Sequence, residues 1–338
     1  MSMTFPTGKL PPEVLSRLLQ HRAAADPNVL IGPGIGLDAA AIAVDDAVIV
    51  AKSDPITFAT EEIGFYAVNV NANDVACMGA EPRWFLATLL LPEAQTDEAL
   101  VERIFMQLHH ACDALGITLI GGHTEITYGL DRPIIAGHML GLTRRERLVD
   151  ARHAQPGDAV LLVRGFPIEG AAIIAHEKAE ALRALGFDET TIAAARNFLH
   201  DPGISVVAAA RLALDTAPVH ALHDPTEGGV ATGLWELAEA ARAGILVQEE
   251  ALQPLPLAAA LCAAFGLDPL GTIASGALLL VAPPDAVETH LAAFAAANIP
   301  AAVVGALRPL EEGRWLVKNG ERRPLPRFDA DEITRLFT

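Results

Sequence analysis

The chain has 338 residues, of which 51% are hydrophobic and only 5% aromatic, so we expect two domains with cores built mainly of Ala, Leu, Val and Ile. Its 24 Lys and Arg residues against 42 Asp and Glu residues give a net charge of −18, which disfavours nucleic acid as a partner because a field of that sign repels phosphate backbones. An anionic nucleotide would need divalent cations or local backbone N–H groups to bind.

The segment 9–25 is predicted to form a short amphipathic helix that begins near Pro12. The residues before it lack the apolar stretch of a signal peptide, and no apolar run in the chain approaches the ~18 residues that cross a bilayer. We therefore expect a cytoplasmic protein with no membrane partner. Three widely spaced cysteines suit a reducing compartment and form neither a zinc motif nor a disulfide framework. They are Cys77, Cys112 and Cys262.

A Gly-rich turn over 31–40 is predicted to lead into a hairpin of two short strands, 41–44 and 47–52. Gly34 to Ala39 matches the loose dinucleotide pattern GxGxxA, but that pattern needs a helix after it, and here a strand is expected. A Rossmann site is therefore disfavoured. The glycines either allow tight backbone geometry or let a phosphate approach the main chain. Asp54 is expected just past the end of the second strand, where functional sites tend to lie.

The helix predicted over 65–78 is unusually polar, although helix interiors disfavour Asn and Asp. Its polar residues fall within six positions and are Asn69, Asn71, Asn73 and Asp74. Residues 71, 74 and 78 would share one face. This pattern indicates a helix that faces a ligand, and a solvated helix face or a buried amide network is the alternative.

A buried strand is expected over 84–91, after a stop at Glu81-Pro82, and a helix over 96–115, with Thr96 as its N-cap and Gly116 at its end. His109 and His110 would lie on the outer side of this helix, where a metal site is disfavoured for want of a third ligand.

A buried strand is expected over 117–120, followed directly by the pentad Gly121-Gly122-His123-Thr124-Glu125. Two glycines after a strand would let the backbone approach a ligand, and the next three residues would place polar groups on one turn. A strand over 133–142 closes the first domain near 144–147.

The second half of the chain reads as an α+β domain from about residue 150. Its predicted strands are 159–163, a strand from 245, 277–281 and 302–307, and its predicted helical segments are 165–174, 179–185, 190–199, 232–243, 257–265 and 285–297. A polar loop over 223–231 opens onto the helix at 232, so an anion site there is plausible, and Asp224 would be a cap or a metal ligand. His220 and His223 lack companions for a metal site.

Five acidic residues stand at a predicted strand end, a Gly-rich turn or a polar helix face rather than in a run of surface charge. They are Asp38, Asp54, Asp74, Glu125 and Asp224. If they converge on one cleft, they would supply the oxygen ligands that Mg²⁺ on a polyphosphate requires. The alternative is that they are dispersed caps and turn residues.

The order and approximate spacing of five motifs resemble the aminoimidazole ribonucleotide synthetase-like (PurM-like) superfamily, and within it the hydrogenase maturation factor HypE and its archaeal-type relatives. The motifs are Gly36 with Asp38-Ala39-Ala40, Ser53-Asp54, Asn73-Asp74 with Met78-Gly79-Ala80, Gly121 to Glu125, and Asp224-Pro225-Thr226 with Gly228-Gly229. The resemblance covers nearly the whole chain.

This resemblance implies a two-domain PurM-like fold, α/β over 1–150 and α+β over 151–338, whose N-terminal domains pair across a homodimer into a barrel. It implies ATP and Mg²⁺ as cofactors. The implied metal ligands are Asp38, Asp54, Asp74 and Asp224, and the implied catalytic residues are Asp54, Asp74 and Glu125. The implied nucleotide contacts are Gly36, Lys52, Asn71, Asn73, Gly121, Gly122, His123, Thr124 and Gly228.

Three positions depart from the family pattern, because Leu37 and His123 stand where acidic residues are usual and Glu227 stands where HypE usually has Arg. HypE also carries a carbamoyl group on a C-terminal cysteine, whereas no cysteine follows Cys262 here. We therefore expect an ATP- and Mg-dependent enzyme that activates a carbonyl or amide oxygen of a small molecule or another protein by phosphorylation. The alternatives are another kinase or amidine-forming ligase of the superfamily, and a non-catalytic nucleotide-binding scaffold.

Overall fold

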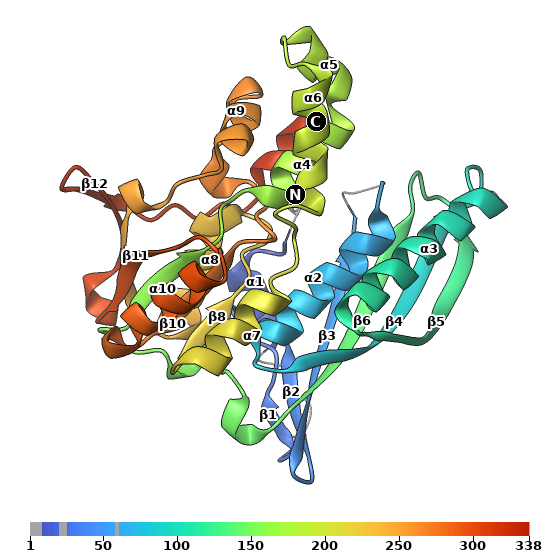
Figure 1. Ribbon diagram of the computed structural model, residues 1–338. Coiled ribbons are helices and arrows are strands. Elements are labelled where there is room, and N and C mark those ends of the chain that lie inside the picture. The colour runs from blue at the N-terminus through green and yellow to red at the C-terminus, as the bar shows by residue number, and fades with distance from the viewer. Residues whose placement is uncertain (1–8, 20–25, 58–60, 338) are drawn as a thin grey trace. The chain divides into compact units, whose positions relative to one another are not determined.

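A computed structural model describes residues 9–19, 26–57 and 61–337, and its contacts divide the chain into two compact units (Figure 1). The N-terminal unit contains 26–32 and 38–148, and the C-terminal unit contains 33–37, 149–337 and the short helix α1 (Pro12–Leu19). Within the C-terminal unit, Glu13 of α1 pairs with Arg327 at 2.8 Å. No helix within the described ranges is long and apolar enough to cross a membrane.

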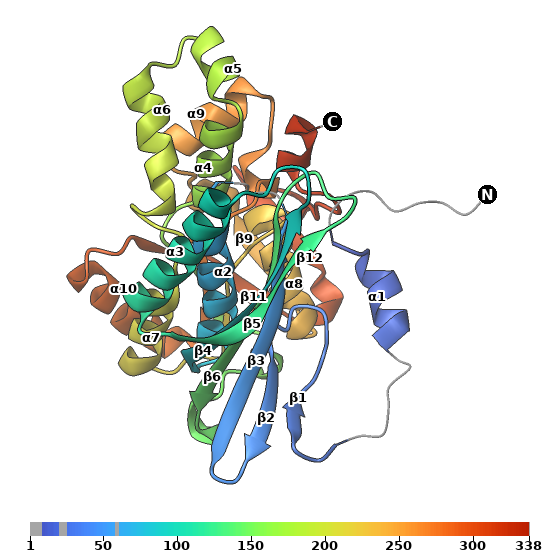
Figure 2. The ribbon, with the colours of Figure 1, turned by 90° about the vertical axis from the view of Figure 1, so that its right-hand side faces the viewer.

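The N-terminal unit is a six-stranded sheet with two helices, α2 (Ile63–Cys77) and α3 (Glu98–Leu115), packed on one face (Figures 1 and 2). Among the described strands of this sheet, β4 and β5 pair in parallel and the other neighbours are antiparallel. The strands in spatial order are β1 (Val29–Ile31), β2 (Ala40–Val44), β3 (Ala47–Ile56), β6 (Ile134–Thr143), β4 (Glu81–Pro92) and β5 (Thr118–Thr127).

The β2–β3 hairpin forms where the sequence predicts it, and a strand, not a helix, follows the Gly-rich turn. Strand β3 is longer than predicted because β6 pairs with it as far as Ile56. Asp54 therefore lies inside a strand, opposite Gly137, and not past a strand end as expected.

The expectation for the Gly-rich pentad is wrong in its local structure, because residues 121–125 lie within β5 and not on a turn. They pair with β4, and a Cβ at Gly122 would collide with the carbonyl of Ala87 on that strand. The segment predicted as a buried strand is also largely exposed, since β5 is the edge of the sheet.

Helices α2 and α3 appear where predicted, with one correction at a cap. The N-cap of α3 is Asp97, whose side chain accepts a hydrogen bond from the Leu100 N–H at 2.8 Å. Thr96 instead donates its hydroxyl to the carbonyl of Pro92. Gly116 ends the helix in the left-handed conformation (φ 68°), as predicted.

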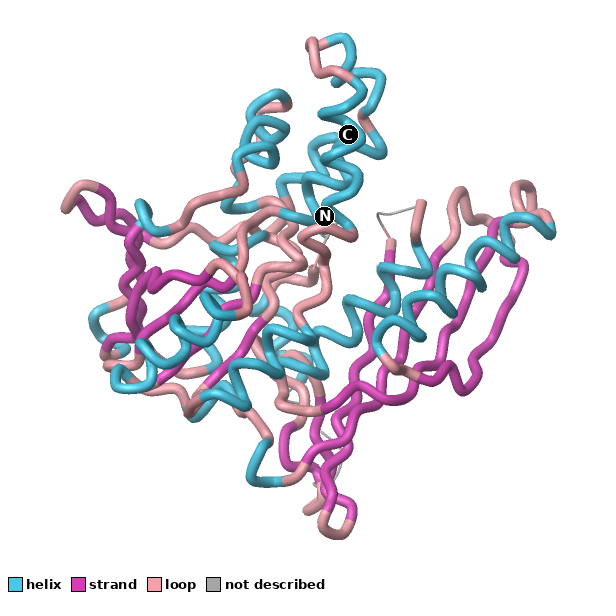
Figure 3. Tube along the Cα trace, viewed as in Figure 1, coloured by secondary structure: helices cyan, strands magenta, loops and turns pink. Residues whose placement is uncertain are grey.

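The C-terminal unit is a seven-stranded sheet in the order β13-β12-β9-β11-β7-β10-β8, and Figure 3 separates its strands from the surrounding helices by colour. Its strands are β7 (Ala159–Val163), β8 (Ala221–His223), β9 (Gly244–Gln248), β10 (Leu278–Ala282), β11 (Ala301–Arg308), β12 (Arg314–Lys318) and β13 (Glu321–Pro324). Its helices after α1 are α4 (Ile168–Glu177), α5 (Ala179–Ala184), α6 (Glu189–Arg196), α7 (Val207–Thr216), α8 (Gly229–Ala240), α9 (Pro256–Ala264) and α10 (Val287–Ala296). Helix α7 and the β12–β13 hairpin were not predicted from the sequence.

A buried carboxyl group on α4 is expected to make the protein less stable as the pH rises. Burial raises the pKa of Glu169 to about 8, and the nearby Glu227 and Asp331 carboxylates act in the same direction. A carboxyl whose pKa is raised on folding contributes stability that is complete below its ordinary value of 4.5 and is lost as the pH passes through about 8. Glu169→Gln should flatten this decline in denaturant unfolding across that range, and an unchanged slope would contradict the assignment.

Candidate active site

A lysine held between carboxylates joins β3 to α2 in the N-terminal unit. The ammonium of Lys52 donates to Oδ1 of Asp74 at 3.0 Å and lies 3.5 Å from Oδ2 of Asp54. The side chain of Asp74 is 7% exposed and that of Asp54 35% exposed, so the cluster extends from the interior to the surface. The pleat places Lys52 and Asp54 on the same face of β3, because residues two apart share a face.

The polar residues of α2 are buried, which excludes a solvated helix face. Asn71 accepts from the Asp54 N–H at 2.9 Å and donates to the carbonyls of Asp54 and Ala67. Asn69 donates to the carbonyl of Phe65. Part of the predicted polar face is thus a buried amide network, and Asn71 fixes the backbone that carries Asp54.

A glycine on β6 that no sequence motif indicated makes room for this contact. Gly137 lies opposite Asp54 on β6, and a Cβ there would collide with Nδ2 of Asn71 and approach the ring of Phe85 to 2.9 Å. Gly137→Ala is expected to lower the free energy of unfolding by about 1–3 kcal/mol, because overpacking would displace Asn71 and the strand that carries Asp54. Denaturant unfolding measures this loss, and an unchanged stability would contradict this account of the packing.

The cluster holds more negative than positive charge. Burial raises the pKa of Asp74 to about 7, and although Lys52 opposes this rise, the Asp38 and Asp54 carboxylates add to it. Burial would lower the pKa of Lys52, but the same three carboxylates outweigh it and keep the ammonium protonated. One cation thus faces three carboxylates, and Oδ2 of Asp74 has no hydrogen-bond partner among the described residues.

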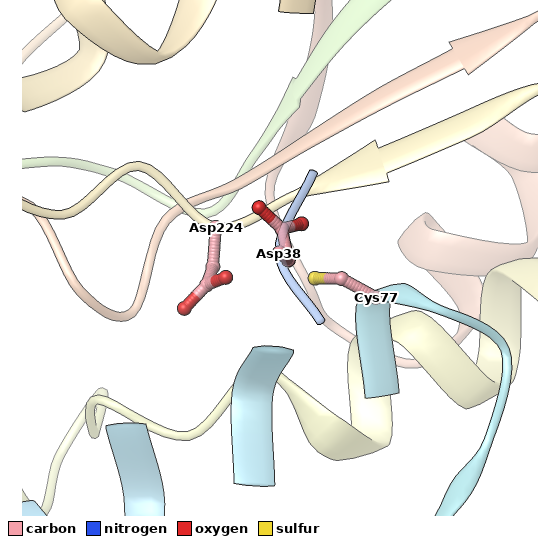
Figure 4. A group of neighbouring side chains, drawn as sticks. All are labelled: Asp38, Cys77 and Asp224. Atoms are coloured by element: carbon pink, nitrogen blue, oxygen red, sulfur yellow. The ribbon is translucent and has the colours of Figure 1, made fainter. Parts of the chain in front are cut away.

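These features fit a divalent cation. A buried carboxylate oxygen without a partner and a surplus of carboxylates are what a hard cation such as Mg²⁺ would satisfy. Asp38 and Cys77 lie beside this cluster with an oxygen and Sγ within 4.8 Å of one another, and Figure 4 shows their side chains pointing toward each other. Cys77 is 1% exposed, as predicted for a core thiol, and its soft sulfur is a poor ligand for Mg²⁺.

The other predicted site residues of the N-terminal unit lie outside the Lys52 cluster. Nε2 of His123 and Oε2 of Glu125 lie 3.5 Å apart on exposed side chains of β5, with Thr124 between the two residues. Because β6 and β4 separate β5 from β3, the β5 backbone lies roughly 14 Å from that of Asp54 at the least. Glu125 is therefore not part of the Lys52 cluster of its own unit. Asn73 is fully buried on α2.

Three predicted residues belong to the C-terminal unit. Asp224, also drawn in Figure 4, follows β8 and is 2% exposed. A Cβ at Gly36 would collide with the carbonyl of Glu236 on α8, so this glycine has a packing role. The N–H of Gly228, in the left-handed conformation that caps α8, donates to Asp331 at 2.6 Å. Asp331 was not anticipated, because it binds a loop about 100 positions earlier in the chain.

Two family models match this chain: AIR synthase related protein, N-terminal domain, over residues 36–143, and AIR synthase related protein, C-terminal domain, over residues 155–314. The chain belongs to the AIR synthase related family. It is 31% identical to the carbamoyl dehydratase HypE of Rhodobacter capsulatus over 245 residues. The aligned region covers 72% of this chain and 68% of that protein. The chain is 30% identical over 288 residues to the HypE of Cupriavidus necator, with coverage of 83% and 78%.

The fold of this AIR synthase related protein is similar to that of solved relatives. A crystal structure of the hydrogenase maturation protein HypE in complex with ATP aligns with a TM-score of 0.71 at 25% identity, covering 94% of this chain and 91% of that one. These matches confirm the family resemblance and the two-domain mixed α/β fold. A barrel across a homodimer needs a second chain and stays a prediction.

Proposed function

We propose that this protein is an ATP- and Mg-dependent enzyme that phosphorylates a carbonyl or amide oxygen. The observation that carries the proposal is the Lys52 cluster, where three carboxylates act on one ammonium and a buried oxygen of Asp74 has no hydrogen-bond partner among the described residues. The relatives named carbamoyl dehydratase and the ATP complex of HypE support ATP-dependent turnover.

In this proposal Asp38, Asp54 and Asp74 hold Mg²⁺, which neutralises the charge on the polyphosphate when bound. The buried hydrogen bonds of Asn71 keep Asp54 at a fixed position on β3. Lys52 orients Asp74 and provides a cation beside the phosphates. Such prepositioning matters because phosphoryl transfer relies on alignment and electrostatic stabilisation more than on covalent chemistry by the protein.

The acceptor in this proposal is a separate small molecule or protein. The segment 328–337 is a fixed part of the C-terminal unit: Asp331 accepts three backbone N–H bonds, from Gly228, Ile273 and Ile333. Glu332 accepts from the Asp268 N–H, and Ile333 is fully buried. These bonds hold the segment 328–337 itself in the C-terminal unit.

The proposal is tested by measuring phosphate release from ATP with a panel of carbamoyl, amide and amine compounds. An activating dehydratase or ligase should release ADP and phosphate only with its acceptor. Recovery of a phosphorylated acceptor as the stable product would favour a kinase, and ATP binding without turnover across the panel would favour the scaffold alternative.

The proposal includes a homodimer formed through β5. The exposed apolar side chains of this strand and the following turn are Ile120 (50%), Ile126 (52%) and Tyr128 (85%), on an unpaired sheet edge. We expect a dimer in sedimentation equilibrium, and Ile126→Glu should shift it to monomer. Leu185→Glu, which alters an equally exposed leucine of the C-terminal unit, is the matched control and should remain dimeric. A monomeric native protein would exclude the dimer.

A further inference from the structure

The N-terminal segment, residues 9–19, belongs to the C-terminal unit but packs on it only loosely. It contains the helix α1, in which no residue from Pro12 to Leu19 is buried, and Leu18 is 53% exposed. The helix has 8 residues, and isolated helices shorter than about 12–15 residues are marginal in water. Helix α1 therefore depends on contacts with the rest of the unit to stay helical.

A lysine attaches the N-terminal segment at its first described residue. The ammonium of Lys9 donates to Oγ1 of Thr226 at 3.3 Å. It also lies 3.5 Å from Oε2 of Glu227 and 3.6 Å from Oε1 of Glu236. The other carboxylate oxygen of Glu236 lies 3.2 Å from Nε2 of His223. Lys9 thus lies directly beside the His223–Glu236 pair.

A glutamate of α1 makes the second attachment. Oε1 of Glu13 accepts from the guanidinium of Arg327 at 2.8 Å. That guanidinium stacks on the ring of Trp235, 4.8 Å from its centroid. Trp235 and Glu236 are partly exposed residues of α8, as is Glu239, and this spacing places all three on one side of the helix. Both attachments therefore reach the same outer face of α8.

Both attachments are of a kind that salt weakens. The side chain of Lys9 is 47% exposed and that of Glu13 is 66% exposed. Exposed ion pairs contribute little to stability and are screened by salt. Elements held in this way open locally at a low cost in free energy, while the core of the unit stays folded. Opening would remove the ammonium from the carboxylates of Glu227 and Glu236.

We propose that the N-terminal segment is a releasable strap over the outer face of α8, held closed by Lys9 at Glu236 and by Glu13 at Arg327. In the closed state α1 is helical, and the Lys9 ammonium offsets the negative charge beside His223. In the open state α1 loses its helical structure, and this face of α8 becomes accessible to solvent. Strap opening does not involve ATP and is independent of the proposed function.

Hydrogen exchange followed by mass spectrometry, on the full chain without ATP, measures strap opening at the amides of α1. In the native protein these amides should exchange faster at about 1 M than at about 50 mM sodium chloride, because salt screens both attachments. At the lower salt concentration, Glu13→Gln and Lys9→Met should each exchange about two- to fivefold faster than the native protein, the effect of losing an exposed ion pair. Lys9 precedes α1, so its substitution leaves the sequence of the helix unchanged.

Two variants are matched controls. Lys9→Arg keeps the charge and should protect α1 as the native protein does. Asp215→Asn breaks an exposed ion pair with Arg211 on α7 and should leave exchange in α1 unchanged. The amides of the fully buried strand β10 report global unfolding and should exchange equally in all variants. Exchange in α1 that responds neither to salt nor to Lys9→Met would overturn the strap, as would an equal rise in Asp215→Asn and Glu13→Gln.

Discussion

Replacing Asp74 with Asn is expected to abolish Mg-dependent ATP binding while the protein stays folded. The asparagine keeps the size of the side chain and can still accept from Lys52, but it removes the carboxylate whose Oδ2 has no partner among the described residues. Removing one partner of a buried charge pair typically weakens binding by ~2–5 kcal/mol, which is about 30-fold or more. Calorimetric titration of ATP with Mg²⁺ measures the effect.

The matched control for this substitution is Asp113→Asn, on an exposed position of α3, which should bind ATP as the native protein does. Circular dichroism and thermal unfolding establish that Asp74→Asn is folded. If a folded Asp74→Asn variant binds ATP with Mg²⁺ as tightly as the native protein does, Asp74 is not a metal ligand and the proposed site is wrong.

Replacing Lys52 with Met is expected to destabilise the protein by about 3–5 kcal/mol, because it leaves Asp74 as a buried charge without its cation. Asp38 and Asp54 would repel that charge further. Millimolar Mg²⁺, added without ATP, should restore part of the lost stability if the three carboxylates can share a divalent cation. Denaturant unfolding with and without Mg²⁺ measures both changes.

The control for Lys52 is Lys318→Met, which breaks an ion pair with Glu249 at 2.8 Å on a lysine that is 60% exposed. An exposed pair contributes ~0–1 kcal/mol, and Mg²⁺ should have no effect on this variant. Two results would argue against a cation-deficient cluster. One is a Lys52→Met protein as stable as the native protein, and the other is a Lys52→Met protein whose stability, like that of Lys318→Met, does not change with Mg²⁺.

Local patterns predicted much of the fold because they need no knowledge of distant contacts. The β2–β3 hairpin follows from two short apolar runs on either side of the turn Asp45-Asp46, and α2 follows from a run without Gly or Pro. The limits of β3 and β5 were missed because pairing with β6 and β4, far along the chain, decides where these strands end.

The residues of the candidate site likewise divide into those that local sequence predicts and those that depend on distant contacts. Asp38, Asp54 and Asp74 were nominated from their unusual settings in the sequence, and all three act on Lys52 in the structure. Gly137 and Asp331 were not nominated because their roles depend on Asn71 and Gly228, which are far from them in the sequence. Conversely, Gly36 and Gly122 match family motifs, yet close packing against Glu236 and Ala87 accounts for them.

The most direct test of this account is calorimetric titration of ATP into the purified native protein, with magnesium and with a chelator. The surplus of carboxylates around Lys52 predicts saturable binding with magnesium and none without it, since the bare polyphosphate would meet like charge. Equal binding in both conditions, or none in either, would contradict a magnesium-nucleotide site at Asp38, Asp54 and Asp74.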